Sequence, residues 1–225
     1  MGTRDQSTER REELLRWAAS LGAVTAEALA ARAHGERQAS ARGRLAAAER
    51  AGHMRSWAPL RGHPPLYTVT GSGLRAAGIA GLASVRVSAA GATHAAAVAG
   101  AAARMERAYP GHAVLGEPAI SSAARRGDRA LGGLCPVLTG RAGPHTHRPD
   151  LALVPAAPRG ALPIAVEIEL SAKSRARLDA ICRAWARHRG VAGVIYVTAT
   201  GAVHRAVLDA IERVDARERI VILTA

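Results

Sequence analysis

The chain lacks phenylalanine altogether, and aromatic residues make up only 3% of its 225 residues. Apolar residues reach 48%, but much of that share is alanine. Any hydrophobic core must therefore be built from leucine, valine, isoleucine and alanine, and each core will be modest. A chain of this length suits one or two domains.

Long apolar runs and cysteines are also scarce. No apolar run approaches the roughly 20 residues that a helix needs to cross a bilayer, so no membrane partner is expected. Residues 1–16 are polar and charged and do not predict a signal peptide. Cys135 and Cys182 have no CxxC spacing and are expected to be buried thiols in a reduced cytoplasm. His145 and His147 have no second pair at zinc-site spacing, and we interpret them as part of a loop.

Lysine is the scarcest charged residue: Lys173 stands alone, and the remaining 30 of the 31 basic residues are arginines. A coding bias toward arginine explains a general preference on the surface. The same bias does not explain why one lysine is retained. A site that needs a compact, titratable ammonium would retain it, because a planar guanidinium cannot replace that group. Chance survival on a helix surface is the alternative interpretation of Lys173.

Basic charge is abundant and is spread over the whole chain. The formal net charge is +13. Residues 1–80 carry 12 Arg against 7 Asp and Glu, or +5, and residues 81–225 carry 19 basic against 11 acidic residues, or +8. This balance favours a polyanionic partner, of which nucleic acid is the commonest, although arginine-rich coding would raise the charge as well.

Residues 1–77 predict a small helical domain that ends in a β-hairpin. The expected elements are helices at Glu9–Leu21, Thr25–Ala33 and Gln38–Ala51, strands at Met54–Trp57 and Leu66–Thr70, and a short helix at Gly71–Ala77. Gly22 is expected to end the first helix, and Thr25 to cap the second. Three helices followed by a two-stranded wing resemble a winged helix-turn-helix, and Gly22–Ala30 is similar to the helix before the recognition helix in many bacterial regulators.

In that arrangement the third helix would enter the major groove of DNA. Its N-terminal part carries the candidate DNA-binding residues Arg37, Gln38, Ser40, Arg42 and Arg44, and Arg55 and Arg61 would place charge on or near the wing. Arginine recognises guanine or phosphate, and glutamine recognises adenine. A solvated helix face is the simplest alternative. Winged helices also serve as dimerisation or protein-docking modules, so a homodimer stays open.

Residues 78–92 predict a linker, and residues 93–225 a second domain of alternating helices and strands. We expect helices at Thr93–Tyr109, Ser171–His188 and Ala202–Val214, a loop at Ile120–Leu134, and strands at His112–Gly116, Pro149–Val154, Leu162–Leu170, Val191–Thr198 and Arg219–Thr224. Leu178, Ile181, Cys182 and Trp185 should face inward. This order predicts an α/β sheet.

Four residues of this domain predict metal-assisted phosphodiester cleavage. Glu167 and Glu169 lie two apart on one apolar strand and so face the same side, where two like charges are costly unless a cation joins them. Asp150 opens the neighbouring strand, and Lys173 follows the glutamates. We expect the three carboxylates to converge on one Mg²⁺ or Mn²⁺ ion, with Lys173 in the first turn of the next helix orienting the nucleophile or stabilising the phosphorane charge.

These residues resemble the PD-(D/E)xK nuclease superfamily, whose restriction-endonuclease-like core is αβββαβ. Pro149-Asp150 matches the PD, and Glu167-Ile168-Glu169 matches the (D/E)xK strand with glutamate in the lysine position. Some restriction enzymes are similar in this Glu-x-Glu, and in other members the lysine has moved to the following helix, where Lys173 is expected. The resemblance implies catalytic and metal-binding roles for Asp150, Glu167 and Glu169, with Lys173 as a further catalytic residue.

The whole chain also resembles actinobacterial replication-relaxation or helix-turn-helix proteins of plasmids and integrative elements. That resemblance rests on His147-Arg148-Pro149-Asp150 and on Ala165–Ser174, and Glu117 is a candidate for an acidic residue after the first strand. It implies a DNA-binding protein of replication or transfer, either a metal-dependent DNA endonuclease targeted by its winged helix or a non-catalytic regulator. A nucleotide-binding domain is a weaker alternative, because the chain has no GxxxxGK[ST] and no strand-linked GxGxxG.

Overall fold

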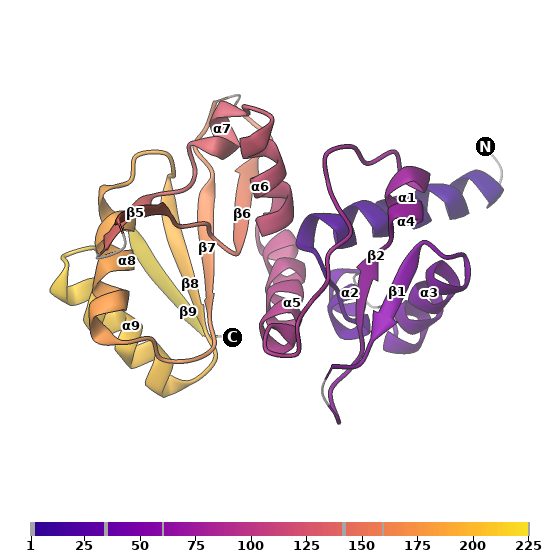
Figure 1. Ribbon diagram of the computed structural model, residues 1–225, viewed down its shortest axis with the longest axis horizontal. Helices are drawn as coiled ribbons and strands as arrows, with labels where there is room; N and C mark the ends of the chain where they lie inside the picture. The colour runs from indigo at the N-terminus through magenta and orange to yellow at the C-terminus, as the bar shows by residue number, and fades with distance from the viewer. Residues whose placement is uncertain (1–2, 34–35, 60, 141–142, 159, 225) are drawn as a thin grey trace. The chain divides into compact units, whose positions relative to one another are not determined.

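The computed structural model describes residues 3–33, 36–59, 61–140, 143–158 and 160–224. The chain is a mixed α/β protein, as the sequence predicts, and it divides into two compact units. The first comprises Met1–Ala108 and Gly116–Ser122, and the second comprises Tyr109–Leu115 and Ala123–Ala225 (Figure 1). Among the described residues, no helix is both long and apolar enough to cross a bilayer.

Up to Ala108, the described part of the first unit contains three helices, a two-stranded hairpin and two further helices. These elements are α1 (Thr3–Leu21), α2 (Ala26–Arg32), α3 (Gln38–Arg50), β1 (Met54–Trp57), β2 (Leu66–Val69), α4 (Gly71–Ala76) and α5 (Ala92–Ala108). Gly22 ends α1 with a positive φ of 88°, a conformation that costs glycine little. The Thr25 side chain accepts a hydrogen bond from the Ala28 amide at 3.1 Å and so caps α2. The order of the first six elements is the predicted one.

The hairpin is held to the helices on one of its sides. β1 and β2 are antiparallel, with Arg55 opposite Thr68 and Trp57 opposite Leu66. The amide and the hydroxyl of Ser56 both donate to Glu49 of α3, at 2.8 Å and 2.6 Å. Met54 and its partner Val69 are buried, whereas Arg55 and Trp57, on the opposite face, are exposed. The hairpin therefore has an inner face on the helices and an outer face that carries Arg55 and Trp57.

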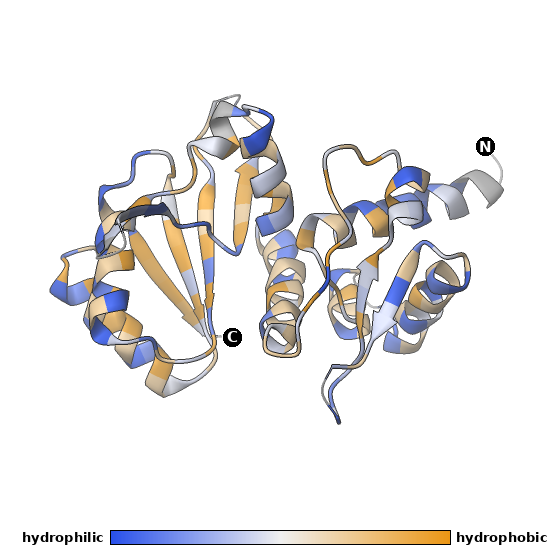
Figure 2. Ribbon diagram, viewed as in Figure 1, coloured by the Kyte–Doolittle hydropathy of each residue, from blue (hydrophilic) through white to orange (hydrophobic). Residues whose placement is uncertain are grey.

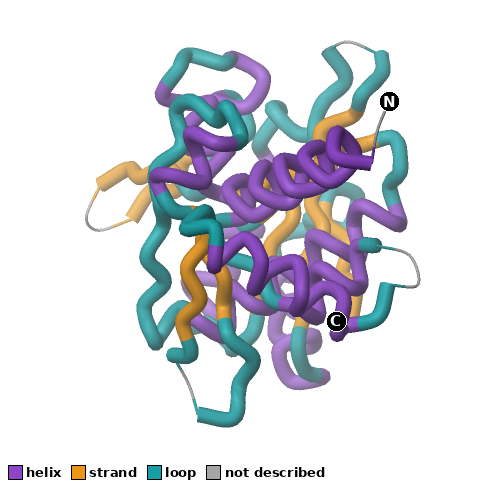
Figure 3. Tube along the Cα trace, turned by 90° about the vertical axis from the view of Figure 1, so that its right-hand side faces the viewer, coloured by secondary structure: helices purple, strands orange, loops and turns teal. Residues whose placement is uncertain are grey.

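Helix α5 belongs to the first unit by its contacts, although the sequence analysis placed it in the second domain. It packs along α2, and Arg32 of α2 forms an ion pair with Glu106 of α5 at 2.6 Å. The segment between α4 and α5 has neither helix nor strand (Figure 1, Figure 3), but Val87 packs against the buried residues Ala23 and Leu66. The periodicity of an alanine-rich helix indicates a buried face but does not identify the partner that covers it.

A five-stranded mixed sheet forms the second unit. Its strands are β3 (His112–Gly116), β6 (Leu151–Pro155), β7 (Ile164–Glu169), β8 (Gly193–Thr198) and β9 (Ile220–Thr224), in the order β3-β6-β7-β8-β9. β6 and β7 are antiparallel, whereas β7, β8 and β9 are parallel. The strands are largely apolar (Figure 2), and the nearly continuous hydrophobic pattern of β7 and β8 is typical of strands buried on both faces.

Helices α8 (Arg175–Arg187) and α9 (Gly201–Arg213) pack against each other and cover the same face of the sheet (Figure 1). The predicted inward residues of α8 are all buried, namely Leu178, Ile181, Cys182 and Trp185. The helix begins at Arg175 rather than at the predicted Ser171, so Lys173 lies in the connection between β7 and α8.

The predicted loop at Ile120–Leu134 is wrong. Helices α6 (Glu117–Arg125) and α7 (Arg129–Gly132) occupy most of it, and Ile120 and Ala123 are buried at helical spacing. A hairpin of β4 (Val137–Gly140) and β5 (Gly143–Thr146) follows, which the sequence analysis did not predict. The described side chains of β5 are mostly exposed. The strand therefore lacks the alternation of apolar and polar residues by which a sequence indicates a strand.

Gly73 in α4 provides a test of the packing between α4 and the hairpin. A Cβ at this position would lie 2.1 Å from the His53 carbonyl oxygen. We expect Gly73→Ala to destabilise the first unit by about 2–3 kcal/mol, because backbone must move to admit the methyl group. Gly43 of α3 is the matched control: an added Cβ meets nothing within 4 Å, so Gly43→Ala should stabilise the helix by about 0.5–1 kcal/mol. Urea unfolding measures both changes, and equal effects of the two variants would contradict the packing described here.

Candidate functional site

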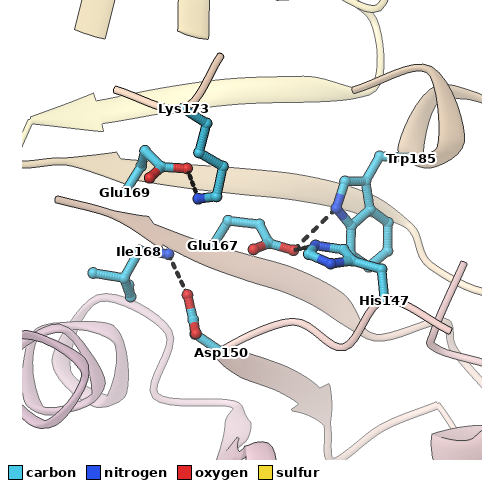
Figure 4. Close-up of polar contacts among 7 residues, drawn as sticks. All are labelled: His147, Asp150, Glu167, Ile168, Glu169, Lys173 and Trp185. Carbon is cyan, nitrogen blue, oxygen red and sulfur yellow. Dashed lines mark hydrogen bonds and ion pairs between the residues drawn. The ribbon is translucent and has the colours of Figure 1, made fainter. Parts of the chain in front are cut away.

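The sheet brings Asp150 and Glu167 beside each other. In the β6–β7 ladder Leu151 pairs with Val166, so Asp150, one residue before β6, lies next to Glu167 on β7. The Asp150 Oδ2 accepts a hydrogen bond from the Ile168 amide at 2.7 Å, which fixes this carboxylate against β7 (Figure 4). The antiparallel register therefore produces the neighbouring acidic pair that the sequence analysis predicted from the two strands.

Glu167 is only 8% exposed, and two side chains from distant segments hydrogen-bond to one of its oxygens. The His147 Nε2 lies 2.8 Å from Glu167 Oε1, and the Trp185 Nε1 donates to the same oxygen at 3.0 Å (Figure 4). His147 follows β5, and Trp185 comes from α8. Sequence analysis assigned His147 to a loop and Trp185 to the core. The signal for His147 was its place in the His147-Arg148-Pro149-Asp150 motif.

Glu169 pairs with the sole lysine. Glu169 is 5% exposed. It accepts a hydrogen bond from the Lys173 ammonium and forms an ion pair with it, and this ammonium points back toward β7 (Figure 4). Lys173 precedes α8, so it lies outside the first turn of that helix, where the sequence analysis placed it. The lysine side chain keeps 33% of its surface exposed, so its charge is accessible from solvent while it offsets that of a buried carboxylate.

The surroundings of Glu167 perturb the ionisation of its carboxyl group. Burial raises its pKa above the ordinary value, the hydrogen bond and charge of His147 oppose the rise, and the neighbouring Asp150 adds to it. A raised pKa caused by burial and a like charge means that negative charge is unfavourable here. A cation close to Asp150 and Glu167 would relieve that cost.

The buried groups around Glu167 do not provide a nucleophile. Tyr196 of β8 is the register neighbour of Glu167, and burial, followed by the Glu167 charge, raises its pKa well above the ordinary value. Burial also raises the pKa of the Cys182 thiol to about 11, so it stays protonated near neutral pH and is a poor nucleophile. Neither Cys182 nor the half-buried Cys135 forms a disulfide.

The carboxylates of this cluster do not form a complete set of protein ligands for a divalent metal. No group of three or more His, Cys, Asp or Glu side chains in the described part of the chain is placed to hold an ion, so the expected convergence of Asp150, Glu167 and Glu169 finds no counterpart there. Glu167 Oε2 and Glu169 Oε1 nevertheless accept no hydrogen bond from the described residues. Mg²⁺ needs only one or two carboxylates when water and phosphate oxygens complete its shell, so Asp150 and Glu167 fit such an ion in chemical type.

Glu117, the remaining acidic candidate, is exposed. It is the first residue of α6 and directly follows β3, as expected for an acidic residue after the first strand. By its contacts it belongs to the first compact unit, whereas Asp150, Glu167 and Glu169 belong to the second.

The candidate DNA-binding residues lie at or near α3 and the hairpin, and some of them already contact acidic side chains of the protein. Gln38 hydrogen-bonds Glu27, Arg42 lies 3.8 Å from the same carboxylate, and Arg44 pairs with Glu36 at 2.8 Å. The exposed candidates are Arg37, Ser40, Arg42, Arg55 and Arg61. Within the described ranges, Arg37, Arg55 and Arg61 form no ion pair. Three arginines are therefore available to an external anion without breaking an internal contact.

Comparison of the chain with protein families, curated proteins and solved structures finds no match.

Proposed function

We propose that this chain is a DNA-binding protein of a plasmid or mobile element that cleaves DNA with a divalent metal, as an endonuclease directed by a winged helix-turn-helix. The observation that carries the nuclease part is the buried Glu167 beside Asp150, across two antiparallel strands and near the only lysine of the chain. Negative charge concentrated in this way is unfavourable unless a cation is bound.

DNA binding is supported by the first unit. The order α1-α2-α3-β1-β2 is the one expected of a winged helix, a fold in which the third helix enters the major groove. Arg37 and Arg42 are exposed at the start of α3, and Arg55 and Arg61 are exposed on the hairpin and its connection. The net charge of +13 favours association with a polyanion.

A PD-(D/E)xK-type core is the finer fold that we propose for the second unit. Asp150 precedes β6, Glu167 and Glu169 lie on the adjacent β7, and α8 leads from β7 to the parallel β8. This sequence of elements is the one expected of the superfamily that the motifs resemble. Glutamate in place of the usual lysine is compensated by Lys173, whose ammonium reaches the same strand.

Each residue of the cluster has a definable role in phosphodiester hydrolysis. Asp150 and Glu167 would hold Mg²⁺ or Mn²⁺, which when bound activates water and offsets charge on the phosphate. His147 and Trp185 fix the orientation of the Glu167 carboxylate through one oxygen and leave the other available. The Lys173 ammonium places a positive charge at the end of β7, where it would offset the negative charge of a phosphate oxygen. Glu169 orients this ammonium.

Binding of Mn²⁺ should stabilise the folded protein through these carboxylates. A ligand that binds only the folded state raises its stability by about 2.7 kcal/mol at one hundred times the dissociation constant, which corresponds to several degrees in melting temperature. We expect this shift for the wild type and its loss in Asp150→Asn. The exposed Asp209 of α9 provides the control, and Asp209→Asn should retain the shift. An equal shift for Asp150→Asn would place Mn²⁺ elsewhere.

A non-catalytic DNA-binding regulator is the second candidate function, and one observation favours it. Each carboxylate of the cluster already has a donor from the protein: the Ile168 amide for Asp150, His147 and Trp185 for Glu167, and Lys173 for Glu169. Such a network can stabilise the sheet without a metal. DNA binding without a Mn²⁺-dependent shift and without cleavage would select this function.

A further inference from the structure

The outer face of the β1–β2 hairpin forms one wall of a hollow of about 560 Å³ in the first unit. Arg55 and Trp57 of β1, Thr68 of β2 and the segment Ser84–Val87 line it. None of the residues that line it is acidic. Its volume lies within the range of sites that enclose small ligands.

Strand alternation leaves an aromatic ring on this face. Ser56 is turned to α3 by its bonds to Glu49, so Arg55 and Trp57 stand on the opposite side of β1. Trp57 is 40% exposed, whereas Trp17 and Trp185 are 5% and 0% exposed. In a chain with so few aromatic residues, a tryptophan left outside both cores is available for a ligand.

The segment 84–87 forms the opposite wall and is anchored at three points. The Ser84 hydroxyl donates to the Val69 carbonyl at 2.8 Å, the Val85 side chain lies beside Gly22, and Val87 packs against Leu66. Arg86 lies between the two packed valines and is exposed. Arg86 therefore lines the hollow together with Arg55, and neither arginine forms an ion pair within the described part of the chain.

An indole ring and two unpaired guanidinium groups that line one hollow match the chemistry of a nucleotide. An aromatic ring stacks on the face of a base, and arginines bind the adjoining phosphates. Bases within a duplex are already stacked on both faces, so only an unpaired base can use the ring. We propose that the hollow binds an unpaired nucleotide of a DNA strand, with its base on Trp57 and its phosphates at Arg55 and Arg86. This inference rests on the proposed DNA-binding function and extends it from the duplex at α3 to an unpaired base at the hairpin.

Tryptophan emission without added divalent metal tests the inference, because Trp17 and Trp185 are buried and the comparison of the wild type with Trp57→Phe isolates the Trp57 signal. Titration with an oligo-dT of about eight nucleotides, within the usual site size of such surfaces, should change the emission of the wild type and not that of Trp57→Phe. Trp57→Ala should bind the oligonucleotide at least about tenfold more weakly. Arg55→Ala combined with Arg86→Ala should reduce the salt dependence, whereas the exposed Arg104→Ala on α5 should not.

A strand of the same length that carries abasic sites at every position separates stacking from charge. It should bind through its phosphates without changing the Trp57 emission. Binding of oligo-dT with no change in Trp57 emission, or an equal change with the abasic strand, would overturn the inference and leave DNA binding intact. Replacement of Arg37, Arg42 and Arg44 should leave the Trp57 response to the short strand unchanged. This variant therefore distinguishes a loss of duplex binding at α3 from a loss of nucleotide binding in the hollow.

Discussion

Replacing Arg37, Arg42 and Arg44 together by alanine is expected to weaken duplex binding by about a hundredfold at low salt, with a salt slope reduced by roughly 2 to 3. Each arginine that contacts a phosphate releases about one counterion. Arg37 needs to break no internal ion pair within the described chain, whereas Arg42 and Arg44 exchange contacts with Glu27 and Glu36 for phosphate. Fluorescence anisotropy of a labelled duplex over a range of salt concentrations measures both quantities.

The control for this variant removes the same charge elsewhere in the first unit. Arg75, Arg104 and Arg107 are exposed on α4 and α5, and their combined replacement by alanine should change the affinity much less. An equal loss in both triple variants would indicate general electrostatic attraction rather than a contact by α3. An unchanged salt slope in the α3 variant would instead indicate that this helix faces a protein partner, such as a second copy of the chain.

Lys173→Arg is expected to lower the rate of DNA cleavage by at least about tenfold, or ~1.4 kcal/mol of barrier. Arginine preserves the positive charge but replaces a compact ammonium by a longer planar fork, which cannot take the same position beside the buried Glu169. The exposed Arg177 on α8 provides the reverse exchange as a control, and Arg177→Lys should cleave at the wild-type rate. Single-turnover nicking of supercoiled plasmid measures these rates, and full activity of Lys173→Arg would show that the sole lysine is incidental.

The candidate site could be predicted only as far as local patterns reach. Glu167 and Glu169 were identifiable because an apolar strand with two charged residues has a cost that the sequence itself reveals. The burial of both confirms that part. His147 and Trp185 lie 20 and 18 residues away from Glu167, and their contact depends on how the segment after β5 and the helix α8 dock onto the sheet. Neither hydrophobic periodicity nor spacing carries that information.

The fold was predictable to a similar extent. Strands β7 and β8 and the inward face of α8 have strong periodic patterns, and the structure places them as expected. Helix α6 was missed because serine, alanine and arginine dilute its apolar face to Ile120 and Ala123. The assignment of α5 to a unit depends on its packing along α2, which is a tertiary preference and not a local one.

The conversion of supercoiled plasmid to its nicked form by the purified wild-type chain is the most direct test of the central claim. We expect nicking with Mg²⁺ or Mn²⁺, none with a chelator, and a loss of activity in Asp150→Asn, whose amide is a poorer ligand for a hard cation. Absence of metal-dependent cleavage by the wild type on duplex, nicked and single-stranded DNA would contradict the claim, as would equal cleavage by Asp150→Asn.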